Sequence, residues 1–307
     1  MRRKIIVFFI VFICLLISYI HKKENSGIEN IKNEQIKNES VNETRKVNLL
    51  YEDEIIDLEL ENYIIGVVSC EMPASFEEEA LKAMAVASRT YALYKMKKNN
   101  KYDLKSTTSD QCYITESDMK KKWGDDYDKY YSKIKNAVND TSGEYMTYND
   151  EVIIAFYFSI SNGYTENCEN VFSQKLDYLV SVESSWDEEY SFKEKDVVFS
   201  INDFLDNLGI TDNGIDNISF DRSSTGRVNS VKINNYSFKG TKFRSLLGLR
   251  STDFDILVDD GNVLIKTKGY GHGVGMSQYG AHSMAKMGYS YDEILKYYYS
   301  GINIVNN

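Results

Sequence analysis

The chain has 307 residues, of which 42% are hydrophobic and 13% aromatic, so it can bury a substantial core and is not an intrinsically disordered protein. Its formal net charge is −10 at pH 7, and no stripe of Lys and Arg offsets this charge. Nucleic-acid-binding proteins need clustered cations for the phosphate backbone, so the charge argues against that class.

A basic start, Arg2-Arg3-Lys4, precedes sixteen mostly apolar residues, 5–20, and then His21-Lys22-Lys23. We interpret residues 1–23 as one membrane helix, because flanking Lys and Arg side chains can reach the interfaces when the apolar run is shorter than about 20 residues. The alternative is a cleaved signal peptide, but no small-x-small cleavage pattern follows. Either way, we expect the rest of the chain to be exported.

Residues 24–46 are rich in Asn, Glu, Lys and Ser and lack an apolar stripe, which predicts a disordered polar tether. Residues 47–307 contain neither a second linker nor an internal repeat. We therefore expect a single body with two lobes from 47 to 307.

The first strong pattern in this body is a buried helix face over residues 60–70. Its apolar positions follow the spacing i, i+3, i+4, i+7, i+8 and are Leu60, Tyr63, Ile64, Val67 and Val68. Glu71 continues this face, eleven residues and almost three turns after the first position. A carboxylate at the end of an apolar stripe suggests a function, although a helix-end carboxylate paired with Arg89 would explain it equally well.

The only proline, Pro73, ends this helix, and Ser75 with Glu78 forms a capping-box pattern for a second helix over 76–97. Glu71 is thus expected at a corner between two helices. Apolar neighbours such as Met72 and Phe76 would raise its pKa.

The remaining patterns predict an α+β fold, a single catalytic body in which helices and antiparallel hairpins form a cleft. Helices are expected over 127–139, 240–249 and 277–299. Strands are expected over 144–148, 152–158, 227–233 and 262–268, the first two joined by a turn at Asn149-Asp150.

A run of alternating glycines, Gly269-Tyr-Gly271-His-Gly273-Val-Gly275, does not match the dinucleotide fingerprint or the phosphate-binding loop. We expect these glycines to let the backbone pass close to a bound sugar, with a helix starting near Ser277. His272 is a candidate general base, but a hydrogen-bonded loop histidine is the simpler interpretation.

Several segments together resemble the stage II sporulation protein D family. They are Gly66-Val-Val-Ser-Cys-Glu71-Met-Pro-Ala-Ser-Phe76, Ala83-Met-Ala-Val-Ala-Ser-Arg89-Thr-Tyr-Ala92, Ser159-Ile-Ser-Asn-Gly163-Tyr-Thr165-Glu-Asn167, Phe243-Arg-Ser-Leu-Leu-Gly-Leu-Arg-Ser251 and Gly271-His-Gly-Val-Gly-Met-Ser-Gln278-Tyr-Gly-Ala281. The resemblance covers the body from about residue 47. It implies a membrane-anchored, single-pass lytic transglycosylase that cleaves peptidoglycan glycan strands in the septum between mother cell and forespore during engulfment.

The family's catalytic glutamate falls on Glu71. Ordinary glycosidases use two carboxyl groups. A lytic transglycosylase lets the C6 hydroxyl of muramic acid attack its own C1, so one glutamate can act first as acid and then as base, and the products carry 1,6-anhydromuramic ends. The resemblance also implies substrate-binding residues, which are Arg89, Gln111, Tyr113, Ser161, Gly163, Thr165, Gln278 and Tyr279.

The resemblance implies partners as well, a cell-wall amidase and a polytopic membrane protein. No cofactor is expected. Many members carry two cysteines before the Gln-x-Tyr element and a histidine before the glycine–threonine loop, but this chain has Lys105, Asp110 and Ser159 there. Cys70, Cys112 and Cys168 also lack C-x-x-C spacing, so no metal site is predicted.

Three alternatives remain open at this point. A cysteine peptidase would use Cys70 with His272 or His282. A non-catalytic wall-binding module would enhance a partner amidase. A muramidase would need a second acid, for which the candidates are Glu166, Glu169 and Asp110.

Overall fold

The computed structural model describes residues 45–97, 101–107, 109–190 and 194–306. They form helices and small, mostly antiparallel sheets, so the α+β class is confirmed. Within these ranges, no helix has both the length and the apolar character that a membrane crossing requires. The predicted anchor, 1–23, lies outside the described residues, as does nearly all of the predicted tether, 24–46.

The described chain begins with a small sheet that the sequence patterns did not predict. Strands β1 (Lys46–Tyr51) and β2 (Glu54–Glu59) pair antiparallel, and β3 (Leu104–Lys105) runs parallel to β1. Only Val47 and Leu49 of β1 are buried. This alternation is too short to stand out beside the polar segment that precedes it.

The two helices around Glu71 form as predicted, as α2 (Leu60–Glu71) and α3 (Glu78–Met96). All five apolar positions of the α2 stripe are at most 6% exposed. The capping box of Ser75 and Glu78 was wrong, because Glu77 is the N-cap residue and no side chain caps this end. The Glu77 N–H instead donates to Nδ1 of His282 at 3.0 Å.

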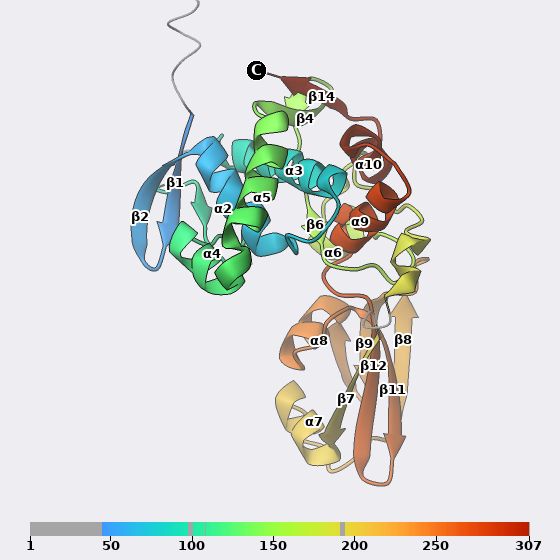
Figure 1. Ribbon diagram of the computed structural model, residues 1–307. Coiled ribbons are helices and arrows are strands. Elements are labelled where there is room, and N and C mark those ends of the chain that lie inside the picture. Colours follow the sequence, from blue (N-terminus) through green and yellow to red (C-terminus); the bar gives the residue numbers. More distant parts are fainter. Residues whose placement is uncertain (1–44, 98–100, 108, 191–193, 307) are drawn as a thin grey trace, which may run out of the picture. The chain divides into compact units, whose positions relative to one another are not determined.

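Helix α3 lies at the centre of a helical group, with α2, α5, α9 and α10 packed against it (Figure 1). Helix α4 (Glu116–Trp123) and a 3₁₀ turn, η1 (Gly124–Asp126), precede α5 (Tyr127–Asp140), which confirms the helix predicted over 127–139. The predicted helix 277–299 is two helices, α9 (Gln278–Lys286) and α10 (Tyr291–Tyr298). The break falls at Gly288, whose φ is +92°, and a capping box of Ser290 and Glu293 starts α10.

Strand β4 (Glu144–Tyr148) pairs with β5 (Glu151–Val152) through the predicted turn, where Asn149 and Asp150 have φ of 50° and 64°. The last strand, β14 (Asn303–Asn306), pairs with the other edge of β4. The strand predicted over 152–158 is interrupted, because only β5 and β6 (Tyr157–Phe158) pair with a neighbour. Strand β6 runs parallel to β13 (Met276–Ser277), which brings the segment before α9 next to Tyr157.

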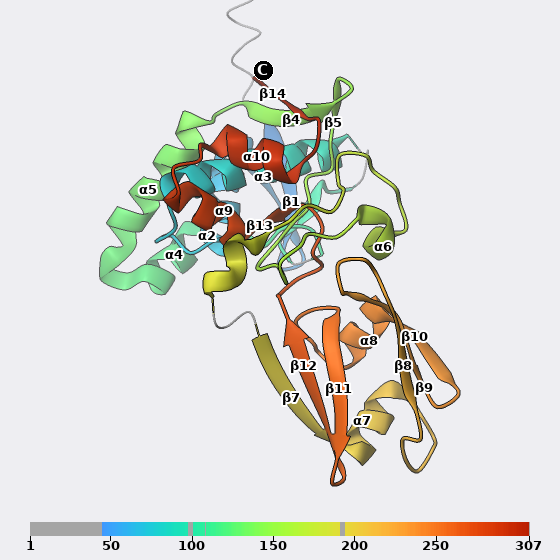
Figure 2. The same ribbon diagram turned by 90° about the vertical axis from the view of Figure 1, so that its right-hand side faces the viewer.

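A second group of elements has its own hydrophobic core (Figure 2). It comprises β7 (Glu194–Ser200), α7 (Ile201–Leu208), β8 (Ile218–Arg222), β9 (Val228–Ile233), β10 (Tyr236–Lys239), α8 (Gly240–Leu246), β11 (Asp253–Asp259) and β12 (Asn262–Lys268). The sheet orders are β10-β9-β8 and β11-β12-β7. Strands β9 and β12 confirm two predicted strands, whereas α8 ends three residues earlier than predicted, before Gly248 with φ of +62°.

The larger core surrounds α2 and α3, and both cores belong to one compact unit, Lys46–Asn307. Between β6 and η2 (Ser185–Glu189) the chain forms a long loop that contains the short helix α6 (Cys168–Phe172). Side chains of this loop reach the second group of elements, and they form the polar network described below.

Candidate functional site around Glu71

Glu71 is the last residue of α2, and groups from three distant segments converge on its carboxylate. The backbone N–H of Cys112 donates to Oε1 at 2.8 Å, and the amide Nε2 of Gln278 lies 3.4 Å from Oε2. The hydroxyl of Tyr157 also hydrogen-bonds to this carboxylate. The carboxylate is thus held by three donors, on the 111–113 loop, β6 and α9.

Burial raises the pKa of Glu71, and the hydrogen bonds from Cys112, Gln278 and Tyr157 lower it only in part. The net shift is upward, the direction expected from the apolar stripe. A carboxyl group with a raised pKa holds its proton closer to neutral pH and can donate it as a general acid. Glu71 therefore has the electrostatic setting of an acid/base catalyst.

A disulfide joins Cys70 to Cys112, with their Cα atoms 5.6 Å apart. Each partner is directly linked to the site, since Cys70 precedes Glu71 and the Cys112 N–H binds its carboxylate. The crosslink holds the end of α2 and the 111–113 loop together. The sequence analysis did not predict this bond, because two isolated cysteines 42 positions apart carry no local pairing signal.

Gln111 directly precedes Cys112 and is fully buried. Its Nε2 donates to the Tyr157 hydroxyl at 3.1 Å, and its Oε1 accepts from the Tyr63 hydroxyl at 3.0 Å. In this arrangement Gln111 orients Tyr157, which in turn binds Glu71. No sequence motif singled out Tyr157, although it lies in a predicted strand.

Tyr113 stacks on Tyr63 with ring centroids 5.7 Å apart. It also covers Gly66, where an added Cβ would lie 2.2 Å from the Tyr113 ring. A glycine at position 66 is therefore needed for the 111–113 loop to pack on α2. Gln111 thus supports the site by orienting Tyr157, and Tyr113 supports it by packing on α2.

Helix α9 brings Gln278 and Tyr279 to the same corner. Ser277 is its N-cap and accepts from the Gly280 N–H, which fixes the first turn. Tyr279 is half-buried and packs edge-on against Phe76 and Tyr190, at 4.9 and 4.7 Å between centroids. Of the predicted substrate-binding residues, Gln278 thus contacts Glu71, and Tyr279 contacts Phe76 in the segment after it.

Arg89 lies elsewhere, because it is fully buried and its guanidinium is occupied. It donates to both carboxylate oxygens of Glu61, at 2.8 and 2.6 Å, and to the carbonyl oxygens of Glu144 and Val138. Glu61 is in the first turn of α2, about 15 Å along the helix from Glu71 at 1.5 Å per residue. This bidentate pair ties α2 to α3, so the geometry gives Arg89 a structural role and no path to a substrate.

The 159–167 loop is held by hydrogen bonds to residues 182–184. The Ser161 hydroxyl donates to the Ser184 carbonyl at 2.8 Å, and the Val182 N–H donates to the Thr165 hydroxyl at 2.8 Å. Gly163 has φ of +116°, a conformation that favours glycine. Ser161 and Thr165 are buried, so these three residues shape the loop, and none of them contacts Glu71.

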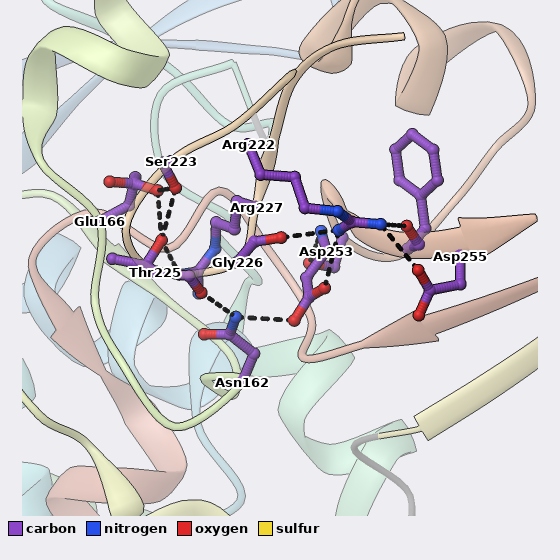
Figure 3. A network of polar contacts seen from close by, with 11 residues as sticks. Asn162, Glu166, Arg222, Ser223, Thr225, Gly226, Arg227, Asp253 and Asp255 are labelled. Carbon is purple, nitrogen blue, oxygen red and sulfur yellow. Dashed lines mark hydrogen bonds and ion pairs between the residues drawn. The ribbon is translucent and has the colours of Figure 1, made fainter. Parts of the chain in front are cut away.

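Glu166 is 1% exposed and accepts four hydrogen bonds. Ser223 and Thr225 donate to Oε2 at 2.6 and 2.5 Å, and Asn167 and Asn170 donate to Oε1 at 2.8 Å each. Burial alone would raise the pKa of Glu166, but these bonds outweigh it and lower the pKa below its ordinary value. The carboxylate links the loop to the β8–β9 connection (Figure 3).

Residues 52–148, which contain α2, α3 and the 111–113 loop, match the family model "Stage II sporulation protein". The chain is 42% identical over 256 residues to the stage II sporulation protein D of Bacillus amyloliquefaciens, covering 81% of this chain and 74% of that protein. It is 40% identical to the Bacillus subtilis (strain 168) protein of the same name, covering 81% and 75%. The chain belongs to the stage II sporulation protein D family.

This family member also has a more distant relative with a different name. The amidase enhancer of Bacillus subtilis (strain 168) is 30% identical over 299 residues, covering 78% of this chain and 40% of that protein. The family model and the two sporulation proteins confirm the resemblance inferred from the motifs around Glu71.

This family member has Asp110 where many members were expected to carry a cysteine. The Asp110 carboxylate pairs with the Lys95 ammonium at 2.5 Å and accepts from the Tyr91 hydroxyl and the Lys105 N–H. Among the described residues, no three His, Cys, Asp or Glu side chains are grouped so that they could hold a metal ion. The ammonium of Lys95 thus occupies the Asp110 carboxylate.

The glycines in the run before α9 lie close to other parts of the protein. An added Cβ at Gly275 would lie 2.0 Å from the Phe156 carbonyl oxygen, and one at Gly273 would lie 2.7 Å from Cζ of Arg227. These contacts explain the glycines without a bound sugar. The glycines let the chain pass close to the protein's own backbone and side chains.

The cysteine-peptidase alternative is also wrong. Cys70 is bonded to Cys112 and has no free thiol. His272 and His282 each use Nδ1 to accept a backbone N–H, from Val274 and Glu77. Burial, with smaller effects of Arg244 and Arg227, lowers the pKa of His272 to about 3, so it stays neutral and structural.

Proposed function

We propose that this protein is a membrane-anchored lytic transglycosylase that cleaves peptidoglycan glycan strands in the septum during engulfment, with Glu71 as the catalytic acid and base. The observation that carries this proposal is a single carboxyl group with a raised pKa, held by three donors, at the position of the family glutamate. The family membership supports a role in sporulation.

The proposed reaction has two proton transfers at one carboxyl group. Glu71 first protonates the glycosidic oxygen that leaves C1 of muramic acid. The resulting carboxylate then takes the proton from the C6 hydroxyl as its oxygen attacks C1, which closes the 1,6-anhydro ring and returns the proton to Glu71. The donors from Cys112, Gln278 and Tyr157 stabilise the carboxylate between the steps.

A muramidase mechanism needs a second carboxyl group that is able to activate water. The strongest candidate, Glu166, already accepts four hydrogen bonds and has a lowered pKa, which makes it a poor base. Asp110 is likewise occupied by Lys95. These contacts favour the single-acid mechanism.

The test is to digest peptidoglycan strands, intact and amidase-stripped, with the full-length chain in water enriched in ¹⁸O. We expect 1,6-anhydromuramic ends without ¹⁸O in the mass spectra of the products. Reducing ends that contain ¹⁸O would show hydrolysis and overturn the transglycosylase proposal.

The relationship to an amidase enhancer supports a second candidate, a non-catalytic module that stimulates a cell-wall amidase. In that case the chain alone would release no glycan fragments, and Glu71→Gln would still stimulate the amidase. Under the first proposal, the substitution abolishes fragment release by the chain alone. A complex with an amidase and a polytopic membrane protein is compatible with both.

A further inference from the structure

Arg227 has an unusual combination of burial and missing partners. It lies directly before β9 and is 3% exposed. Its Nε has no hydrogen-bond partner, and Nη1 makes a single 3.4 Å contact with the Thr225 hydroxyl. None of the ion pairs found in the described part of the chain includes Arg227, and the nearby Asp253 and Asp255 pair with Arg222. A buried guanidinium whose Nε has no partner and whose Nη1 has one distant partner points to a group that binds there.

The guanidinium is also fixed in place. It lies against the backbone of Gly273, where an added Cβ would approach Cζ to 2.7 Å. The nearby carboxylate of Glu166 does not bind Arg227, because its acceptors are used by Ser223, Thr225 and two asparagines. Figure 3 shows Arg227 beside this network, with Asn162 and Asp253 on its other side. Arg227 therefore has a defined position but unused donors.

Arg227 lines a pocket of about 400 Å³. One wall comes from the loop around α6 and includes Glu169 and Asn170, and the other comes from β9 and β10 and includes Asn229 and Lys239. The volume is in the range of about 300–1,000 Å³ that is typical of small-molecule sites. Neither Glu71 nor any of its three hydrogen-bond donors lines this pocket, so it is a separate feature.

The charges of the pocket define the class of ligand. Its lining has three acids and two bases, which are Glu166, Glu169, Asp221, Arg227 and Lys239. This balance disfavours an anion. A neutral carbonyl oxygen would satisfy the guanidinium without adding negative charge, and the amide and hydroxyl groups of the lining suit sugar hydroxyls. Val171 and Val228 offer apolar contact for a methyl group.

We propose that this pocket binds one N-acetylated sugar residue, whose acetamido carbonyl oxygen accepts a hydrogen bond from Arg227. The choice of ligand rests on the proposed function, because glycan strands of the wall consist of N-acetylated sugars. The pocket would be a second binding site for the strand, separate from Glu71.

The test uses the full-length chain with Glu71→Gln, so that no strand is cleaved, and with ¹⁵N-labelled arginine. The Nε–H signal of Arg227 is assigned with Arg227→Lys and followed by NMR during titration with an N-acetylglucosamine tetramer. We expect this signal to shift and saturate, while that of Arg222, which pairs with Asp255 at 2.7 Å, stays in place. The de-N-acetylated tetramer and acetate should cause no shift.

A rim variant provides a second measurement that does not depend on the buried arginine. Asn229 lines the pocket and is half-buried, so Asn229→Ala should fold normally and weaken the affinity measured through Arg227 about fivefold to tenfold. The control is Lys232→Ala, an exposed residue of the same strand outside the pocket, which should bind as before.

The proposal is overturned if the Arg227 signal does not shift with the tetramer, or if the de-N-acetylated tetramer or acetate shifts it equally. The NMR result does not depend on whether the wild-type chain cleaves strands. A shift at Arg227, found together with a wild-type chain that cleaves no strands, would support the pocket and refute the transglycosylase. Cleavage without such a shift would do the reverse.

Discussion

The backbone N–H of Cys112 donates to Oε1 of Glu71 at 2.8 Å, across 41 positions of the chain. The neighbouring disulfide between Cys70 and Cys112 holds these two groups together. The proton affinity of the proposed catalytic group therefore depends on a covalent crosslink.

Glu71→Gln should preserve the fold and lower strand cleavage by at least about 10²-fold, because the amide keeps volume and hydrogen bonding but cannot deliver a proton. The amide of Gln278 can rotate to present its oxygen to the new side chain. Cleavage is measured by mass spectrometry of released fragments, and folding by circular dichroism. Wild-type rates in a folded variant would refute the role of Glu71.

The same variant should have a different pH dependence of stability. Since the folded-state pKa of Glu71 is raised, the folded state binds more protons than the unfolded state between the two pKa values. The contribution of Glu71 to the free energy of unfolding is therefore present below the unfolded pKa and falls as the pH rises through the folded pKa. Glu71→Gln should lack this decline and melt at or above the wild-type temperature at neutral pH.

Removing the disulfide with Cys70→Ser/Cys112→Ser should lower the free energy of unfolding by about 2–4 kcal/mol. It should also loosen the Cys112 N–H, which lowers the pKa of Glu71, so that pKa should rise further. We expect reduced cleavage with its basic limb moved to higher pH in the profile of kcat/KM. The matched control is Cys168→Ser, which removes a buried cysteine outside the disulfide. A double variant with an unchanged pH profile would contradict the positioning role.

Glu166→Ala should leave the products with anhydro ends and destabilise the fold by about 2–4 kcal/mol, since four donors lose their acceptor. Because its folded pKa is lowered, the stability that Glu166 contributes is present above the unfolded pKa and is lost as the pH falls through the folded pKa. Urea unfolding at pH 7 and at acidic pH measures both effects. A folded variant that no longer cleaves strands would revive the muramidase mechanism.

Arg89→Met should destabilise the fold by about 3–5 kcal/mol, because it leaves the carboxylate of Glu61 without its partner. The double variant with Glu61→Gln should recover much of this loss, which a double-mutant cycle measures. At a temperature where the variant is folded, the KM for strands should be unchanged. A raised KM with intact stability would restore Arg89 as a substrate-binding residue.

EDTA should change neither strand cleavage nor the melting temperature. The reason is the ion pair between Asp110 and Lys95, which occupies the carboxylate at a position where many family members were expected to carry a cysteine. The measurement is activity and thermal unfolding before and after chelation. Activity lost on chelation and restored by zinc would overturn this prediction.

The sequence by itself determined the local structure and the identity of the central residue. The apolar spacing in α2, the stop at Pro73 and the strands around Asn149-Asp150 are set by interactions within a few residues, so their patterns are readable along the chain. Glu71 was found because it continues a local stripe and lies in a family motif.

Only the tertiary structure decided which residues surround Glu71. Tyr157 and Cys112 reach it across long separations, and their approach depends on the packing of β6 and on a disulfide that no local pattern encodes. The same packing removed Arg89 from the site, because the nearest carboxylate in space belongs to Glu61 at the far end of α2. Long-range contacts are set by the whole core, and a single sequence shows the residues but not which of them meet.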